Sequence, residues 1–290
     1  MTQTNRIAFQ GEPGAYSHEA CANTYPAMEV LPCRAFEDVV EAVRTGKADL
    51  AMLPVENSTY GRVADIHHLL PESGLHIIAE TFVRVRVALM GPPGARLDDI
   101  RHVRAHPVLI PQAKGFLNRH GITSEAAVDS AGAAADLARG GQDGDGVLAS
   151  ELAAQIYGLD VLARDIEDHG HNTTRFLVMS PRADYQRRGD TGMLTSFVFR
   201  VRNIPAALYK AMGGFATNGV NMTKLESYMV NGMFTATQFY ADIEGHPEDE
   251  NVRLAVDELS YFTSHLAILG TYPADPLRAH QAAQLGAMPR

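Results

Sequence analysis

The sequence predicts an α/β protein of two domains, and three observations support this. Its 290 residues exceed the usual length of one domain. Up to about residue 180, short apolar runs alternate with segments of helical periodicity, which indicates βαβ units and largely parallel sheets. Residues 181–192 are polar and lack apolar periodicity, and a βαββαβ pattern follows them, typical of a ferredoxin-like domain.

The first domain is predicted from its apolar periodicity. One face of a helix is predicted by the spacing of Phe36, Val39, Val40 and Val43. The strand expected at residues 49–53 should end at Pro54. The expected strands are residues 7–9, 49–53, 75–90 (one or two strands), a strand at 103, 126–128, 147–149 and 161–162. The expected helices lie near residues 36–43, 110–120, 132–139 and 151–157.

These elements suggest two lobes with a cleft between them. The chain enters a second lobe before the Gly91–Gly94 cluster, and residues 165–174 can carry it back to the first. The predicted domain covers residues 1–182, with lobes of about 1–80 plus 166–182 and of 81–165. Clefts between lobes are common sites for small molecules.

The second domain is predicted over residues 193–275, after a linker at 183–192. Asn231-Gly232 lies between two strand-like runs and is a strong hairpin signal. Residues 276–290 are expected to form a loose tail. The expected strands are 195–201, 220–229, 234–243 and 266–270, and the expected helices are 206–217 and 248–262.

Composition excludes several classes of protein. The net charge is -9 and no basic block occurs, so we expect no nucleic-acid partner. The chain holds only two cysteines and no apolar run long enough to span a bilayer, and its first residues lack a signal-peptide pattern. We therefore expect a cytoplasmic protein with no membrane partner.

Three polar constellations could carry chemistry. The turn from Gly11 to Gly14 precedes Ser17, so backbone N–H groups at a helix start could hold an anion. Residues 54–59 follow a buried strand, where open α/β sheets bind ligands. Arg175 stands where residues 172–178 enter an apolar strand and could clamp a carboxylate. Each pattern alone also fits an ordinary turn, cap or surface residue.

In order along the chain, these motifs are specific. Gly-Glu-Pro-Gly-Ala-Tyr-Ser-His at 11–18, Leu-Pro-Val-Glu-Asn-Ser-Thr-x-Gly at 53–61 and Thr-Arg-Phe at 174–176 resemble prephenate dehydratase. Asn-Met-Thr-Lys-Leu-Glu-Ser at 221–227 resembles the ACT regulatory domain of that family. The resemblance implies a catalytic domain like a two-lobed type II periplasmic binding protein. It also implies conversion of prephenate to phenylpyruvate in phenylalanine biosynthesis, with no metal and no organic cofactor.

The resemblance also implies roles for residues of the first domain. Thr174 would assist departure of the substrate hydroxyl, with Arg175 and Asn57 as further catalytic residues. The residues expected to bind substrate are Ser17, Glu56, Ser58, Thr59, Gln112, Ser130 and Phe176. The family's second-lobe pattern Ser-His-Pro-Gln-Ala-Leu-x-Gln-Cys is only partly kept: His106, Pro107 and Gln112 match, but Ala105, Val108 and Ala113 do not.

The second domain implies regulation by L-phenylalanine. Its Glu-Ser pair is kept, but the family's Gly-Ala-Leu reads Ala206-Ala207-Leu208 here, and Tyr228-Met229 replaces Arg-Pro. The residues expected to bind the effector are Ala206, Ala207, Leu208, Asn221, Glu226 and Ser227. ACT domains pair with one another, so a homodimer or homotetramer is expected. Two other functions stay open: an arogenate dehydratase, which acts on the aminated substrate, and a non-catalytic amino-acid sensor.

Overall fold

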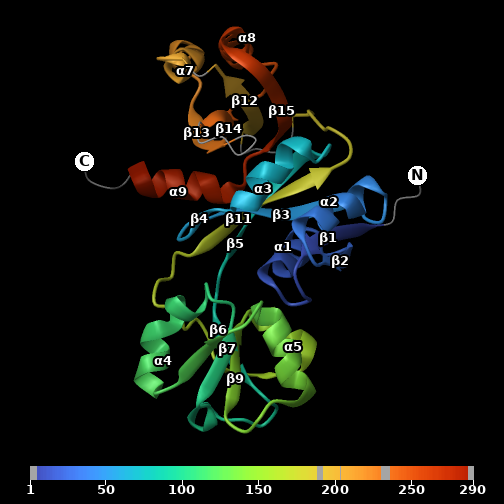
Figure 1. Cartoon of the computed structure of the whole chain (residues 1–290), viewed down its shortest axis with the longest axis vertical. Coiled ribbons are helices and arrows are strands. Elements are labelled where there is room, and N and C mark those ends of the chain that lie inside the picture. The colour runs from blue at the N-terminus through green and yellow to red at the C-terminus, as the bar shows by residue number, and fades with distance from the viewer. Residues whose placement is uncertain (1–4, 188–191, 203, 230–235, 287–290) are drawn as a thin grey trace. The chain divides into compact units, whose positions relative to one another are not determined.

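The computed structural model describes residues 5–187, 192–202, 204–229 and 236–286, and it divides the chain into two compact units (Figure 1). The first unit holds the chain up to Val63 together with Phe82–Phe176. The second holds Ala64–Thr81 together with the chain from Leu177 onward. The division differs from the predicted lobes, because residues 64–80 group with the C-terminal part.

One lobe of the first unit is a parallel sheet covered by helices. β1 (Arg6–Gln10) pairs in parallel with β2 (Glu29–Cys33) on one side and β3 (Leu50–Asn57) on the other. β4 (Gly61–Arg62) is a short antiparallel addition to β3, and the helices are α1 (Tyr16–Thr24) and α2 (Phe36–Arg44). As predicted, α2 buries its apolar face, with Val39, Val40 and Val43 almost inaccessible to solvent.

Pro54 does not end β3, contrary to the sequence prediction. The strand runs through Pro54 to Asn57. Its pairing with β1 ends at Met52, so the missing N–H of Pro54 lies beyond the last β1 partner and costs no hydrogen bond of that pair. The extension carries Glu56 and Asn57 out past the end of β1.

The other lobe of the first unit is a five-stranded sheet in the order β10-β6-β9-β7-β8. β7 pairs in parallel with β8 and β9, but β6 is antiparallel to β9 and β10, so the expectation of a largely parallel sheet is wrong here. The reason is that β6 follows directly from the chain crossing between lobes and has no preceding crossover helix. The strands are β6 (Ala88–Gly91), β7 (His102–Ala105), β8 (Thr123–Ala126), β9 (Asp145–Ala149) and β10 (Asp160–Ala163).

Helices cover both faces of this five-stranded sheet, and α4 and α5 flank it in Figure 1. One buried cluster includes Leu117 of α4, and another includes Ala134 and Ala154 of α5 and α6. The helices are η2 (Leu97–Asp99), η3 (Ile110–Ala113), α4 (Lys114–His120), α5 (Ser130–Gly140) and α6 (Glu151–Tyr157). β8 ends at Ala126, two residues before the predicted strand end, so Val128 lies outside the sheet.

The C-terminal unit confirms the βαββαβ order. Its antiparallel strands follow the order β13-β14-β12-β15, with α7 and α8 on one face (Figure 1). The elements are β12 (Met193–Val201), α7 (Ala207–Thr217), β13 (Met222–Met229), β14 (Ala236–Glu244), α8 (Glu250–Phe262) and β15 (Thr263–Pro273). The predicted turn at Asn231-Gly232 lies outside the described residues.

The chain between β4 and β6 contributes to this unit as well. α3 (Ala64–Leu69) and η1 (Leu70–Glu72) precede β5 (His76–Arg84), whose Ile77 pairs with Gly270 of β15. His67 of α3 meets the ring of Tyr240 edge-on at 5.2 Å between centroids. β5 and β11 (Thr173–Ser180) each run from one unit into the other.

The predicted loose tail is a helix over most of its length. α9 (Pro276–Gly286) follows β15, and Arg278 at its start forms two hydrogen bonds to the buried Glu80, at 2.6 and 2.9 Å. The backbone N–H of Asp275 donates to the same carboxylate at 3.0 Å. A buried carboxylate of this kind needs such partners, and they fix the start of α9. Among the described residues, no helix is long and apolar enough to cross a membrane.

Candidate active site

A cleft of about 290 Å³ in the first unit is lined by residues of both lobes. Three helices begin at its walls: α1 near Ser17, α5 at Ser130 and α6 just after Ser150. Helix starts carry N–H groups and a partial positive charge, and α1 has no side-chain cap, whereas Asp129 and Ser150 cap α5 and α6. The start of α1 therefore favours an anionic ligand. The remaining walls come from the end of β3, the end of β7, the start of β11 and the chain crossings between lobes.

Asn57 and Thr174 meet at one wall of the cleft. Asn57 Nδ2 donates hydrogen bonds to Thr174 Oγ1 at 3.0 Å and to Asn172 Oδ1 at 2.6 Å. Asn57 Oδ1 accepts from the backbone N–H groups of Thr59 and Tyr60 at 2.9 and 3.0 Å. These contacts hold the amide in one orientation, with its NH₂ group toward Thr174.

The hydrogen-bonded chain continues into the second lobe. Asn172 Nδ2 donates to Gln112 Oε1 at 2.5 Å, and Gln112 Nε2 donates to the carbonyl of Val108 at 2.8 Å. Asn172 is buried, so these bonds are shielded from water. Four polar side chains from three segments therefore form one ordered network along the cleft.

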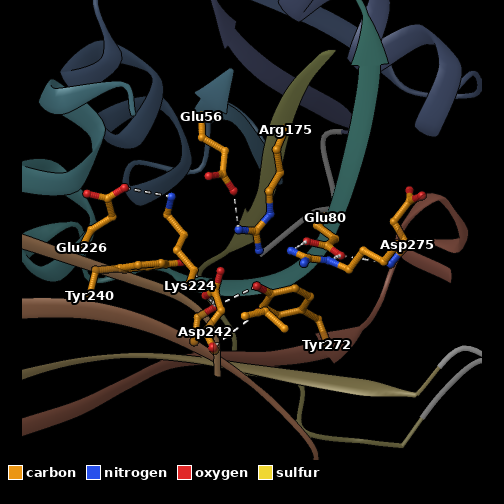
Figure 2. Close-up of polar contacts among 12 residues, drawn as sticks. Glu56, Glu80, Arg175, Lys224, Glu226, Tyr240, Asp242, Tyr272 and Asp275 are labelled. Atoms are coloured by element: carbon orange, nitrogen blue, oxygen red, sulfur yellow. Dashed lines mark hydrogen bonds and ion pairs between the residues drawn. The ribbon is translucent and has the colours of Figure 1, made fainter. Parts of the chain in front are cut away.

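Arg175 lies behind the cleft and pairs with Glu56. Figure 2 shows the two side chains pointing toward each other from β11 and β3, and Arg175 Nη1 lies 2.9 Å from Glu56 Oε1. The guanidinium side chain is 1% exposed and the carboxylate side chain 31%. Neither residue lines the cleft. The ion pair between them instead joins the end of β3 to the start of β11 and stabilises both segments.

Ser58 and Thr59 also lie outside the lining residues. Ser58 Oγ donates to the carbonyl of His171 at 3.0 Å and accepts from the N–H of Thr173 at 2.9 Å. Phe176 of β11 is buried. Of the residues predicted to bind substrate, the structure places Ser17, Gln112 and Ser130 on the cleft; Glu56, Ser58, Thr59 and Phe176 support the segments around it.

Several cleft residues were not predicted as site residues. His106 follows β7, Asn172 precedes β11, and Tyr16 opens α1. Asn172 directly precedes the Thr-Thr-Arg run, and His106 was noted only as a match to the family pattern. Their part in the cleft depends on contacts between distant segments, which spacing along one chain does not show.

The two lobes touch at the rims of the cleft. Ser150 Oγ donates to the carbonyl of Gly14 at 2.6 Å, and the Tyr157 hydroxyl donates to the carbonyl of Pro13 at 2.8 Å. At the opposite rim, the Tyr60 hydroxyl donates to the carbonyl of Val108 at 2.9 Å. These three bonds join the two lobes on either side of the cleft.

Burial shifts the pKa of two groups near the turn from Gly11 to Gly14. Burial, with a smaller contribution from Glu19, raises the pKa of Tyr16 well above its ordinary value, and its hydroxyl donates to the carbonyl of Arg86 at 2.7 Å. Burial lowers the pKa of His18, whose Nδ1 accepts from the N–H of Gly14 at 3.0 Å. Both groups are thereby favoured in their neutral forms.

The residues predicted to bind an effector lie on two elements of the C-terminal unit. Ala206, Ala207 and Leu208 stand at the start of α7, and Ala206 has left-handed backbone angles, with φ of 61°. Asn221 precedes β13, which carries Glu226 and Ser227. Glu226 pairs with Lys224 at 3.3 Å, a contact drawn in Figure 2.

Fold and site together define a mixed α/β protein whose polar cleft presents hydroxyl and amide groups from two lobes. The family model of prephenate dehydratase matches residues 7–184, which is more than half of the chain. The chain belongs to the prephenate dehydratase family, a family of lyases.

Relatives and a solved structure agree with this assignment. A protein of Komagataeibacter europaeus named as a bifunctional N-acyl-homoserine lactone acylase/prephenate dehydratase is 50% identical over 272 residues, covering 94% of this chain and 97% of the relative. Arogenate dehydratase/prephenate dehydratase 1 of Arabidopsis thaliana, described as chloroplastic, is 38% identical over 94% of this chain and 73% of the relative. The crystal structure of prephenate dehydratase in complex with L-Phe from Arthrobacter aurescens superposes with a TM-score of 0.84 at 27% identity, covering 97% of this chain and 98% of that chain.

Proposed function

We propose that the protein is a prephenate dehydratase that converts prephenate to phenylpyruvate. The single observation that carries the proposal is the Thr174 hydroxyl, held by Asn57 at 3.0 Å on the wall of a cleft at which three helices begin. In this reaction the C–C bond to the ring carboxylate breaks and its electron pair enters the ring. The ring hydroxyl leaves with a proton as water, and carbon dioxide is released.

The residues of the cleft fit this chemistry. The departing oxygen needs a hydrogen-bond donor, and Thr174 Oγ1 already accepts from Asn57, which leaves its own proton available. A threonine hydroxyl is a weak acid, so Thr174 assists by hydrogen bonding, and any full proton transfer involves water. The start of α1, Ser17 and Ser130 would hold the substrate carboxylates. Positioning and electrostatic stabilisation then supply most of the rate enhancement.

The fold supports a finer division of the chain. In this proposal, residues 1–182 form a catalytic domain of the type II periplasmic-binding-protein kind, 183–192 a linker and 193–275 an ACT domain. L-phenylalanine would bind the ACT domain of a homodimer or homotetramer and inhibit the enzyme. The named complex of the Arthrobacter relative with L-Phe supports the effector, and the altered Ala206 and Tyr228-Met229 positions predict a changed affinity.

The proposal is tested by turnover of prephenate and arogenate side by side, with and without L-phenylalanine, in the presence of EDTA. We expect phenylpyruvate from prephenate, loss of activity in Thr174→Ala and partial recovery in Thr174→Ser. An arogenate dehydratase would instead form phenylalanine from arogenate. No turnover of either substrate, together with tight L-phenylalanine binding, would support an amino-acid sensor instead.

A second activity is suggested by the Komagataeibacter relative, whose name includes an N-acyl-homoserine lactone acylase. Its 50% identity over 94% of this chain is the observation in favour, because the match extends over both units. We therefore include amide hydrolysis of an N-acyl-homoserine lactone as a second assay on the same preparation. Release of free homoserine lactone above the rate without enzyme would support it.

A further inference from the structure

Asp168 binds both sides of the junction between η3 and α4. Its backbone N–H donates to the carbonyl of Gln112 at 2.6 Å, and its carboxylate Oδ2 accepts from the backbone N–H of Gly115 at 2.9 Å. Asp168 lies on the segment that runs from β10 back to β11, so the two bonds join this segment to a helix start 53 residues earlier in the chain. Asp168 itself does not line the cleft.

The contact between Asp168 and Gly115 leaves no room for a side chain at residue 115. A Cβ there would overlap Oδ1 of Asp168 and lie 3.1 Å from its Cγ. Gly115 does not have a positive φ, so its backbone conformation would accept an alanine. The carboxylate of Asp168 is therefore the main obstacle to a side chain at this position.

Gln112, which Asp168 holds, is the first of three amides that lead to Thr174. Its Oε1 accepts from Asn172 Nδ2 at 2.5 Å, so Oδ1 of Asn172 faces Asn57 and accepts from it at 2.6 Å. The other N–H of the Asn57 amide donates to Thr174 at 3.0 Å. Each amide is oriented by the one before it, because an amide that turned over would place a donor against a donor.

We infer that Asp168 is a positioning residue that acts on the Thr174 hydroxyl through Gln112. The inference rests on the proposed function, in which Thr174 assists departure of the substrate hydroxyl. Without the carboxylate, the start of α4 loses its bond at Gly115, and the side-chain oxygen of Gln112 is no longer fixed opposite Asn172. The rate of the chemical step therefore falls, whereas substrate binding, in which Asp168 takes no direct part, changes little.

Steady-state kinetics of the full-length enzyme with prephenate test this inference. We expect Asp168→Ala to lower kcat about fivefold with a smaller change in KM. Asp168→Asn keeps an oxygen that can accept from Gly115 and should recover most of the loss. Gly115→Ala displaces the same carboxylate without removing it and should lower kcat to a similar extent.

Asp99→Ala is the matched control. Asp99 accepts the backbone N–H of Arg96 at 3.0 Å at the start of η2, in the same lobe but outside the cleft lining. Its replacement removes a similar hydrogen bond and should leave kcat unchanged.

A double-mutant cycle separates positioning from a general loss of stability. Gln112→Leu removes the amide through which Asp168 acts, so adding Asp168→Ala to it should lower kcat no further. A merely structural role would lower kcat about fivefold in both backgrounds, and that result would overturn the inference.

The outcomes keep the two proposals apart. If the unmodified enzyme turns over prephenate and Asp168→Ala has the same kcat, the inference is overturned and the proposed function stands. An unmodified enzyme that does not turn over prephenate overturns the proposed function, and the inference with it. Should Asp168→Ala fail to fold, Gly115→Ala with and without Gln112→Leu gives the same comparison.

Discussion

Asn57 Nδ2 lies 3.0 Å from Thr174 Oγ1, while Asn57 Oδ1 accepts the N–H groups of the two residues that follow Ser58. One amide thus joins the end of β3, the turn after it and the start of β11. Because all its polar atoms are engaged, the amide cannot rotate without breaking several bonds. Thr174 is therefore placed by a residue 117 positions away in sequence.

Replacing Asn57 should impair catalysis more than binding. In Asn57→Ala, Thr174 loses the N–H that orients its hydroxyl, so we expect kcat to fall about 10²-fold or more with a smaller change in KM. Asn57→Asp should be as impaired, because a carboxylate cannot donate to Thr174. Steady-state kinetics with prephenate measure the effect, and Asn118→Ala on α4 is the control. An unchanged kcat would contradict the role of the amide.

The ion pair between Glu56 and Arg175 predicts unequal effects of removing each partner. Arg175→Leu leaves the Glu56 carboxylate without its 2.9 Å partner and removes a fully buried guanidinium, so the free energy of unfolding should fall by about 3 kcal/mol. Glu56→Gln keeps an acceptor oxygen for the guanidinium and should cost about 1 kcal/mol. Urea unfolding of both variants measures the difference; equal losses would contradict it.

The sequence predicted this site in part, and the limits have physical reasons. Strand and helix periodicity located the βαββαβ unit and α2, and the motifs brought Asn57 and Thr174 to attention. The prediction that Pro54 ends the strand was wrong, because a proline removes a hydrogen bond between strands only where the partner strand still pairs beside it. The pairing of β3 with β1 ends before Pro54. The network through Asn172 and Gln112 was not predicted, because it is set by the meeting of two lobes. α9 was missed because its anchor, Glu80, lies far away in sequence.

Gly14 should tolerate no side chain, since it faces α6 across the rim of the cleft. A Cβ at Gly14 would lie 2.7 Å from the Cα of Ala153, and φ is +94° there. Gly14→Ala should therefore break the bonds from Ser150 and Tyr157 to this turn and displace the cleft wall at Gly14, raising KM for prephenate. Gly46→Ala is the matched control, because φ is +73° but nothing lies within 4 Å, so it reports backbone strain alone. Equal kinetics in the two variants would argue against the close approach.

The backbone conformation of Ala206 predicts that replacing this residue with glycine stabilises the protein. Its φ of 61° lies in the left-handed region, which costs an alanine about 1–2 kcal/mol, whereas the related family motif has glycine at this point. Ala206→Gly relieves this strain but increases the entropy of the unfolded chain, for a net gain of about 0.5–1 kcal/mol. Ala206→Asn, which tolerates left-handed angles, should gain less. Thermal unfolding measures both, and a lower midpoint for Ala206→Gly would contradict the strain.

The depressed pKa of His18 predicts a loss of stability in acid. Its ring stacks on Phe9 at 5.3 Å, its Nδ1 accepts from Gly14, and burial lowers its pKa below the ordinary 6.5. Below pH 6.5 the unfolded chain binds a proton at this residue more readily than the folded one does. The contribution of His18 to the free energy of unfolding is therefore complete above pH 6.5. It is lost as the pH falls through the lower pKa that His18 has in the folded state. Urea unfolding across this pH range should show that the free energy of unfolding depends less steeply on pH in His18→Gln than in the unmodified protein. The amide oxygen of the glutamine can still accept from Gly14. A slope in His18→Gln equal to that of the unmodified protein would show that His18 is not the group responsible.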